Sequence, residues 1–489
     1  MNGGVQPIDW LAITPPLALA LGAIAVLMAD GFLVRWRAWS PSGLSVAAIL
    51  VAGVAVAVLA GDARDVFCVE LSSAGAPVVC SYAVDTVSIA VWVVVLVGTL
   101  VVTLLSSSGA IDARVPLPEH HFLLLCSASG AMALAASRDL ITLLISLEVV
   151  SLPAFAMAGL KRGDRRSAEA ALKFFLVSVV SAAVMLLGIS FVYGATGAVH
   201  LESVRAALDA GVDAEPVAVA GVMLTLVGLG FKVAAVPFHA WVPDVYVGAP
   251  VPVAAYLSVV SKAAGFVGLI IVLGLGFTPY SWAWGPAVGV LAALTMTVGN
   301  VLALRQRNAV RLLAWSSVAQ SGFILAPLAV VGEVGDLAVR ASLGYLLIYA
   351  VVNLGAFAVV AMMVRDRPAG QLADYAGLLR REPWAGVGLA FALLCLAGLP
   401  PGVIGLFAKL VAFQAVVEGG MGWLVAVMAA NVAIGLAYYL RWTVVILSPS
   451  GEEEARPVVH PAVGAAVGGT LTLAVGLSLL PAAVFNVLG

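Results

Sequence analysis

Five ionisable side chains lie inside long apolar stretches of this sequence, where a charge is costly. They are Glu148, Lys173, Lys232, Lys262 and Lys409. The chain has 24 Lys and Arg residues, and every basic residue inside an apolar stretch is a lysine. An ionisable group at the centre of a bilayer costs roughly 2.5–3.5 kcal/mol on insertion scales. Because a buried lysine can release its proton whereas arginine keeps it almost everywhere, this set indicates reversible protonation.

Two of these lysines lie beside prolines that should interrupt a helix. Pro237 follows Lys232 in GFKVAAVPFHAWVPD, and Pro400 and Pro401 precede Lys409 in AGLPPGVIGLFAKL. Proline removes a backbone donor and clashes with the preceding turn. Unsatisfied backbone at membrane depth is tolerated only where it faces protein or a water-filled cavity. We therefore expect water to reach both lysines, and a kinked helix with a paired lysine is the simpler alternative.

Glu148, in ITLLISLEVVSLPAF, is the natural ion-pair partner of Lys232. Buried ion pairs are often poor stabilisers, so a functional pair is favoured over one that only fixes helix packing. Lys262 lies near the middle of its apolar stretch and cannot easily reach the surface. Lys173 is closer to an end and could instead extend its ammonium to the membrane surface.

Two further polar residues follow the first break and are candidates for an accessory proton path. His239 could relay protons toward an aqueous face, or it could be an ordinary interfacial histidine. Asp244 lies near the same mouth. Lys173 belongs to this accessory group, and no residue spacing in the chain is typical of a metal site.

The elements that position these residues are membrane-spanning helices. The chain has 489 residues, of which 63% are hydrophobic and only 10% are charged, against roughly a quarter charged in soluble proteins. A soluble enzyme, a nucleic-acid-binding protein and a disordered scaffold are therefore excluded. About 20 apolar residues span a bilayer, and breaks at Pro, Gly and charge clusters predict 14 spans. The predicted spans are 8–33, 43–61, 84–106, 120–136, 138–160, 167–193, 216–242, 252–274, 284–304, 308–330, 337–363, 385–415, 422–447 and 463–486.

Basic residues predict the orientation of these spans. Loops after odd-numbered spans contain 16 Lys and Arg residues, among them Arg35, Arg37 and Arg456, whereas loops after even-numbered spans contain four. Cytoplasmic loops are enriched in Lys and Arg, so both termini are predicted to lie outside. Cys68 and Cys80 share one predicted outer loop, where they could form a disulfide or remain free thiols.

The two helix breaks fall in the seventh and twelfth spans, which are five spans apart. Broken helices at corresponding positions of two halves are typical of transport sites. Because five is odd, the two five-helix repeats would have opposite orientations. We therefore predict an all-α polytopic membrane protein with a three-helix segment (1–119), a first repeat (120–275), an inverted second repeat (276–447), and a cytoplasmic loop with a final helix (448–489).

Three stretches resemble a known family: GFKVAAVPFHAWVPDVYVGAPVPVAAYLSVVSKAAGF, ALRQRNAVRLLAWSSVAQSGF and GLPPGVIGLFAKL. They are similar to the antiporter-like membrane subunits of respiratory complex I, NADH:quinone oxidoreductase, and most similar to bacterial subunit N. The resemblance covers most of the fourth to thirteenth spans. The lysine after GLPP is the residue found in subunits N and L, whereas subunit M has glutamate there.

The resemblance implies proton translocation driven by quinone reduction elsewhere in the complex. By position, Glu148 matches the family's fifth-helix glutamate and Lys232 its partner on the broken seventh helix. Lys262 matches the relay lysine, and Lys409 the exit-side lysine. The family often has SSIAH where this chain has SSVAQ, so Gln320, which cannot titrate, puts a histidine relay at that site in doubt.

The family context also implies partners and cofactors. The chain itself should hold no cofactor, whereas NADH, FMN, iron–sulfur clusters and quinone are expected in other subunits. Implied neighbours are subunits M and K, together with lipids of the bacterial cytoplasmic membrane, and no nucleic acid is expected. The alternatives are a subunit of a multisubunit cation/proton antiporter or membrane-bound hydrogenase, a structural membrane subunit, and a solute transporter. Four intramembrane lysines argue against a structural filler, because such a subunit would avoid their insertion cost.

Overall fold

The computed structural model describes residues 8–32, 40–70, 78–449 and 459–488. The predicted topology markers Arg35, Arg37 and Arg456 lie outside the described residues. Apolar runs of the length that a bilayer requires dominate the described chain, and they form long helices joined by short connections.

The elements of the first part of the chain are α1 (Trp10–Phe32), α2 (Ser40–Leu59), β1 (Arg64–Glu70), β2 (Val78–Val84), α3 (Thr86–Leu105), α4 (Leu117–Ala135), α5 (Leu140–Ala158), α6 (Arg165–Thr196), α7 (Leu201–Ala210), α8 (Glu215–Lys232), α9 (Trp241–Gly248), α10 (Val251–Tyr256), the π-helix η2 (Leu257–Ser261), α11 (Lys262–Ile271), the π-helix η3 (Val272–Gly276) and the 3₁₀ turn η4 (Thr278–Tyr280).

The second part contains α12 (Ser281–Ala303), α13 (Ala309–Leu328), α14 (Val331–Val334), α15 (Asp336–Asp366), the 3₁₀ turn η5 (Leu372–Tyr375), α16 (Leu378–Arg381), α17 (Pro383–Ala397), α18 (Val403–Glu418), α19 (Gly422–Leu447), α20 (Pro461–Leu479) and α21 (Pro481–Val487).

Twelve helices of the described chain are long and apolar enough to cross a membrane. The prediction of a polytopic helical membrane protein is therefore confirmed. The helix α4 is not among the twelve, and neither are α17 and α18, which are short because residues 398–402 interrupt the predicted twelfth span.

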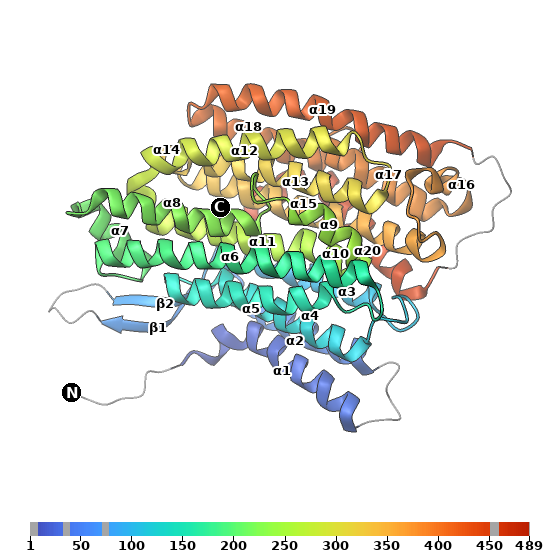
Figure 1. The fold of residues 1–489 in the computed structure, drawn as a ribbon, viewed down its shortest axis with the longest axis horizontal. Helices are drawn as coiled ribbons and strands as arrows, with labels where there is room; N and C mark the ends of the chain where they lie inside the picture. Colours follow the sequence, from blue (N-terminus) through green and yellow to red (C-terminus); the bar gives the residue numbers. More distant parts are fainter. Residues whose placement is uncertain (1–7, 33–39, 71–77, 450–458, 489) are drawn as a thin grey trace.

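The long helices run side by side, and Figure 1 shows most of them extending across the molecule between two ends. The hairpin β1–β2 and the short helix α7 lie at one end, on the left of the view, and α16 lies at the other. The helix α15 packs against α3 and α10 from the first part of the chain and against α13, α17, α18 and α20 from the second. It is therefore the element on which both parts of the chain converge.

Close helix contacts depend on small residues, as they do in other membrane bundles. The helices α6 and α8 pack directly against each other. A Cβ atom on Gly188 of α6 would lie 2.5 Å from the backbone nitrogen of Thr225 on α8. A larger residue at position 188 would push these helices apart, and α8 is the helix that ends at Lys232.

The segment between α2 and α3 is a β-hairpin, which the helical pattern of the sequence did not predict. The strands β1 and β2 pair antiparallel, with Cys68 opposite Cys80. The two cysteines are joined in a disulfide in this structure. The hairpin is fixed to α1 by Arg64, whose guanidinium donates to the Asp9 carboxylate at 2.6 Å.

Candidate functional site

Both interrupted helices place a lysine beside the interruption. The helix α8 ends at Lys232, an irregular segment containing Pro237 follows, and α9 resumes at Trp241. In the second case Pro400 and Pro401 lie in the irregular segment between α17 and α18, and Lys409 is in the second turn of α18. Lys232, Lys262 and Lys409 are 2%, 1% and 5% exposed, respectively, so all three are inside the bundle.

Lys262 is held by an uncharged set of oxygen atoms on α13. Its ammonium donates to the backbone carbonyl of Ser317 at 2.6 Å, to the hydroxyl of Ser317 at 3.0 Å and to the hydroxyl of Ser321 at 2.9 Å. Each hydroxyl donates its own proton to a carbonyl on α13, so its lone pairs are left for the lysine. The π-helix η2 ends immediately before Lys262, and such π-turns are common at functional sites.

Lys409 binds the carbonyl oxygens that the helix interruption leaves free. Its ammonium donates to the carbonyls of Leu396 at 2.9 Å and Ala397 at 2.6 Å, both at the end of α17. It also lies 5.7 Å from the centre of the Phe323 ring. The interruption is therefore part of the lysine's binding site, because a continuous helix would have used these carbonyls itself.

Gln320 connects the surroundings of Lys262 to those of Lys409. Its amide nitrogen donates to the carbonyl of Leu396 at 3.3 Å, the same oxygen that Lys409 binds, and to the Tyr439 hydroxyl at 3.0 Å. Its amide oxygen accepts from the Tyr345 hydroxyl at 2.7 Å. Since a carbonyl can only accept, Leu396 fixes which end of the amide is the nitrogen.

The hydroxyl of Tyr439 is also 2.6 Å from the hydroxyl of Ser316. Because Tyr439 already accepts from Gln320, it can donate to Ser316. The helix α13 thus contributes to the surroundings of both buried lysines. The hydroxyls of Ser317 and Ser321 bind Lys262, and Gln320 binds the carbonyl that also accepts from Lys409.

The expected contact between Glu148 and Lys232 is open in this structure. The ammonium of Lys232 has no hydrogen-bond partner, and neither does the buried oxygen Oε1 of Glu148. The ammonium instead lies 5.7–5.8 Å from the ring centres of Phe155, Phe174 and Phe231. Glu148 and Phe155 are seven residues apart on α5, so they share one face of that helix.

The helix α11 connects Lys232 to Lys262. A Cβ atom on Gly265 would lie only 2.8 Å from the Cβ of Lys232, so α11 packs against Lys232 at this glycine. Lys262 begins the same helix three residues earlier, which places it on the neighbouring face. The helix α11 therefore brings Lys262 close to the end of α8, where Lys232 lies.

The accessory residues lie elsewhere. The ammonium of Lys173 is about half exposed and forms ion pairs with Glu169 at 2.8 Å and Asp244 at 3.0 Å. Asp244 also faces Arg311 at 3.7 Å. These residues form a surface cluster on α6, α9 and α13. His239 lies in the first interruption beside Trp315, with ring centres 5.6 Å apart, and its Nδ1 atom has no partner.

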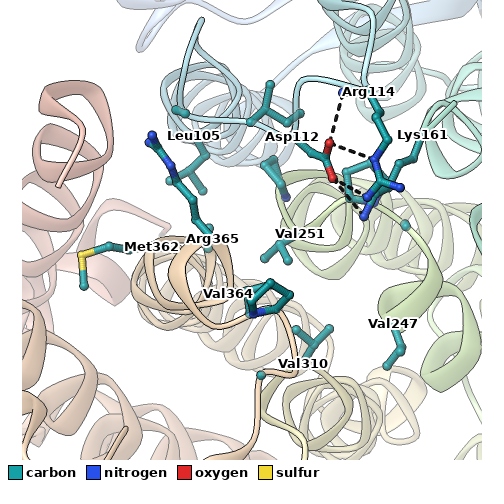
Figure 2. Close-up of a pocket in the computed structure, with 18 of the residues that line it drawn as sticks. Leu105, Asp112, Arg114, Lys161, Val247, Val251, Val310, Met362, Val364 and Arg365 are labelled. Carbon is teal, nitrogen blue, oxygen red and sulfur yellow. Dashed lines mark hydrogen bonds and ion pairs between the residues drawn. The ribbon is translucent and has the colours of Figure 1, made fainter. Parts of the chain in front are cut away.

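A cavity of about 830 Å³ opens at one end of the bundle, and Figure 2 shows part of its lining. The connections after predicted spans 3, 5, 7, 9, 11 and 13 all contribute to it. Asp112 bonds to Arg114 at 2.9 Å and to Lys161 at 3.0 Å on one side, and Arg365 lines another part of the wall. The Arg114 guanidinium, helped by the Lys161 ammonium, holds the pKa of Asp112 well below its usual value.

Several residues of this site carry no signal that the sequence alone could reveal. Ser317, Ser321, Tyr345 and Tyr439 are ordinary small or aromatic residues in apolar helices, and only their positions around the lysines distinguish them. Within the described part of the chain, no group of three or more His, Cys, Asp or Glu residues could hold a metal ion.

Comparisons with known proteins show the family of this chain. Residues 137–435 match the family model described as NADH:quinone oxidoreductase/Mrp antiporter, TM. The chain is 54% identical over 464 residues to NADH-quinone oxidoreductase subunit N 2 of Streptomyces griseus, covering 92% of this chain and 85% of the relative. It is 44% identical to NADH-quinone oxidoreductase subunit N of Salinispora tropica over 94% of this chain and 88% of the relative.

Solved structures show the same fold. A chain of respiratory complex I from Thermus thermophilus is 31% identical and superposes with a TM-score of 0.80, covering 96% of this chain and 98% of that chain. A chain of the Mrp complex from Dietzia is 19% identical, with a TM-score of 0.81 over 98% of this chain and 96% of that chain, and it shows a shared fold.

Proposed function

Because this chain belongs to the NADH:quinone oxidoreductase/Mrp antiporter family of membrane proteins, we propose that it is a proton-translocating membrane subunit of an NADH:quinone oxidoreductase, of the subunit N type. The observation that carries the proposal is the set of three buried lysines, Lys232, Lys262 and Lys409, together with the half-buried Glu148. Three buried lysines with few or no charged partners are expensive to retain in a membrane bundle, which argues for a use in proton transfer.

The proton path runs through these residues. The proton of Lys232 passes to Lys262, which α11 holds next to it. It then passes along the α13 side of the site to Lys409 and leaves on the outer side. Gln320 lies between the two lysines but cannot titrate, so water carries the proton past it. Moving one charge against 100 mV requires about 2.3 kcal/mol, which the redox reaction elsewhere in the complex supplies.

The contact between Glu148 and Lys232 is the step that the rest of the complex controls. When the two are in contact, the carboxylate stabilises the ammonium and the proton stays. When they separate, as in this structure, Lys232 can release its proton. Quinone reduction elsewhere in the complex drives this separation through a neighbouring subunit.

We also propose a membrane topology, which the family assignment supports. The helix α4 and the pair α17–α18 complete the twelve candidate spans to 14. With 14 spans, we divide the chain into a three-helix segment (1–119), two inverted repeats (120–275 and 276–447) and a last segment (448–489). The cavity supports the alternation of spans, because the chain that follows spans 3, 5, 7, 9, 11 and 13 lines it. We assign this end to the cytoplasm and both termini to the outside, so the cavity is the aqueous entrance for protons.

The partners are the other membrane subunits of the complex, with subunits M and K as neighbours in the bacterial cytoplasmic membrane. The NADH, FMN, iron–sulfur clusters and quinone belong to other subunits. The translocase activity is a property of the assembled complex, to which this chain contributes the proton path.

The test is proton pumping by the assembled complex in membrane vesicles. Lys232→Ala and Glu148→Ala should each lower the number of protons pumped per NADH oxidised. Arg205→Ala is the matched control, because this basic residue is exposed on α7, pairs with Asp209 at 3.7 Å and belongs to no proposed proton path. Near-normal pumping by assembled Lys232→Ala complexes would contradict the proposal. Sodium-dependent proton exchange by the purified chain would favour a cation/proton antiporter instead.

A further inference from the structure

Four aromatic side chains pack together beside Lys232, and the proposed proton path assigns them no role. Phe155 is on α5, Phe174 on α6, Phe231 on α8 and Trp241 on α9, so four helices contribute one ring each. Phe155 and Phe174 meet edge to face, with centres 4.7 Å apart, and Phe174 stacks on Trp241 at 4.3 Å. The four rings thus form one packed unit around the first helix interruption.

The ammonium of Lys232 lies against this unit. Its nitrogen is 5.7 Å from the centre of Phe155 and 5.8 Å from the centres of Phe174 and Phe231. All three distances are within the range of about 6 Å in which a cation is attracted to the face of an aromatic ring. Phe174 thus contacts Trp241 by stacking and also lies within cation–ring distance of the lysine.

The same ammonium makes no hydrogen bond in the described chain, although Lys232 is 2% exposed. A buried ammonium without a polar partner is costly. Besides the electrostatic attraction of the Glu148 carboxylate, which makes no hydrogen bond to the ammonium, three ring faces are the attractive groups nearest to it. Aliphatic side chains could fill the same space, but only aromatic rings have negative faces that attract the ammonium.

We propose that Phe155, Phe174 and Phe231 form an aromatic cage that holds the protonated Lys232 while it is separated from Glu148. The inference rests on the proposed function and adds a second binding place for the ammonium. Glu148 and Phe155 lie on one face of α5 about two turns apart, so the lysine side chain exchanges the carboxylate for the cage by moving along this face.

The three phenylalanines are therefore positioning residues for the proton-transfer step. With the cage, the contact to Glu148 can open before the proton leaves, because the charged lysine has an alternative place. Without the cage, opening the contact would leave a bare ammonium in the bundle, and the lysine would remain bound to Glu148.

The test replaces Phe174 with a series of fluorinated phenylalanines carrying one, three and five fluorine atoms. Fluorine withdraws charge from the ring face but changes its shape little, so the series separates cation attraction from packing. Pumping per NADH should fall step by step, by about thirtyfold from phenylalanine to the pentafluoro ring, since a desolvated cation–ring contact of about 2 kcal/mol corresponds to that factor. A Phe155 series should behave in the same way.

Phe277 provides the matched control, because it is also 0% exposed but lies outside the cage. Its fluorination should leave pumping unchanged. A flat series at both Phe174 and Phe155 in assembled complexes would overturn the cage, and so would a loss that is complete with the first fluorine. If the pentafluoro variant does not assemble, the slope over one and three fluorine atoms decides.

The two proposals fail separately. If Lys232→Ala stops pumping but the fluorinated series is flat, the cage is wrong and the proton path stands. If Lys232→Ala pumps normally, the proposed function itself is wrong.

Discussion

Removing the two serine hydroxyls that bind Lys262 should weaken proton transfer although every charged residue stays in place. Ser317→Ala and Ser321→Ala each delete one of the three oxygen atoms that accept from the ammonium, and only the backbone carbonyl of Ser317 remains. Neither change alters a charge or a large side chain. The helix α13 keeps its shape, because alanine is a good helix former.

The magnitude follows from the number of bonds lost. A hydrogen bond to a charged group contributes about 1.5–3 kcal/mol. One substitution should therefore disfavour the protonated form of Lys262 by about one to two powers of ten, since 1.36 kcal/mol is a factor of ten. The double variant loses both hydroxyls, and its effect should be about twice as large in free energy.

The assay compares electron transfer with proton pumping in vesicles containing the intact complex. The single variants should pump more slowly, and the double variant should pump least. Ser342→Ala is the matched control, because this buried hydroxyl donates to the carbonyl of Ile324 at 2.8 Å. Full pumping by the double Ser317→Ala/Ser321→Ala variant would refute the assignment of Lys262 as the relay.

Three further predictions use other parts of the molecule. Gln320→Leu should lower the stability of the purified chain by about 2–4 kcal/mol, because it leaves the buried Tyr345 hydroxyl without its partner and removes two more bonds; thermal unfolding measures this, and an unchanged midpoint would contradict it. The lowered pKa of Asp112 means that its ion pairs contribute above the unfolded pKa of about 3.9 and are lost only as the pH falls through the lower folded value. Asp112→Asn should therefore lower the midpoint of thermal unfolding slightly, by the equivalent of about 1 kcal/mol or less for exposed pairs. This loss should be constant from pH 8 to 5 and shrink below pH 4. A loss that shrinks already between pH 7 and 5 would argue against the lowered pKa of Asp112. A membrane-impermeant maleimide should label Cys68 and Cys80 in intact cells only after reduction, whereas labelling that needs permeabilised cells would place the hairpin on the cytoplasmic side.

The long helices of this fold could be predicted from the sequence because a helix that spans a bilayer needs about 20 mostly apolar residues. The predicted span 422–447 coincides with α19, and the predicted span 308–330 differs from α13 by two residues or fewer at each end. The interruptions at Pro237 and Pro400 were also predictable, because proline removes a backbone donor and clashes with the preceding turn, although Pro153 is accommodated inside α5. The hairpin was not, since its strands RDVFCVE and VVCSYAV are seven residues each, too short to span a bilayer and without a helical pattern.

The site was only partly predictable, because charge marks a residue but not its surroundings. Lys232, Lys262 and Lys409 stand out in sequence as charges in apolar helices. Lys173 stands out in the same way, yet its ammonium is on the surface beside Asp244, because this part of α6 faces α9 at the end of the bundle. Phe174, by contrast, is one apolar residue among many, and only the packing of four helices shows that it contacts Lys232.

The end of α17 has a consequence for Lys409 that goes beyond its two hydrogen bonds. The carbonyl end of a helix carries roughly half a negative elementary charge from its aligned peptide dipoles. The protonated lysine therefore leaves about half a positive charge uncompensated there, and the neutral lysine leaves about half a negative charge. Neither form leaves a full unbalanced charge inside the membrane, so the proton can arrive and depart without a counter-ion having to move with it.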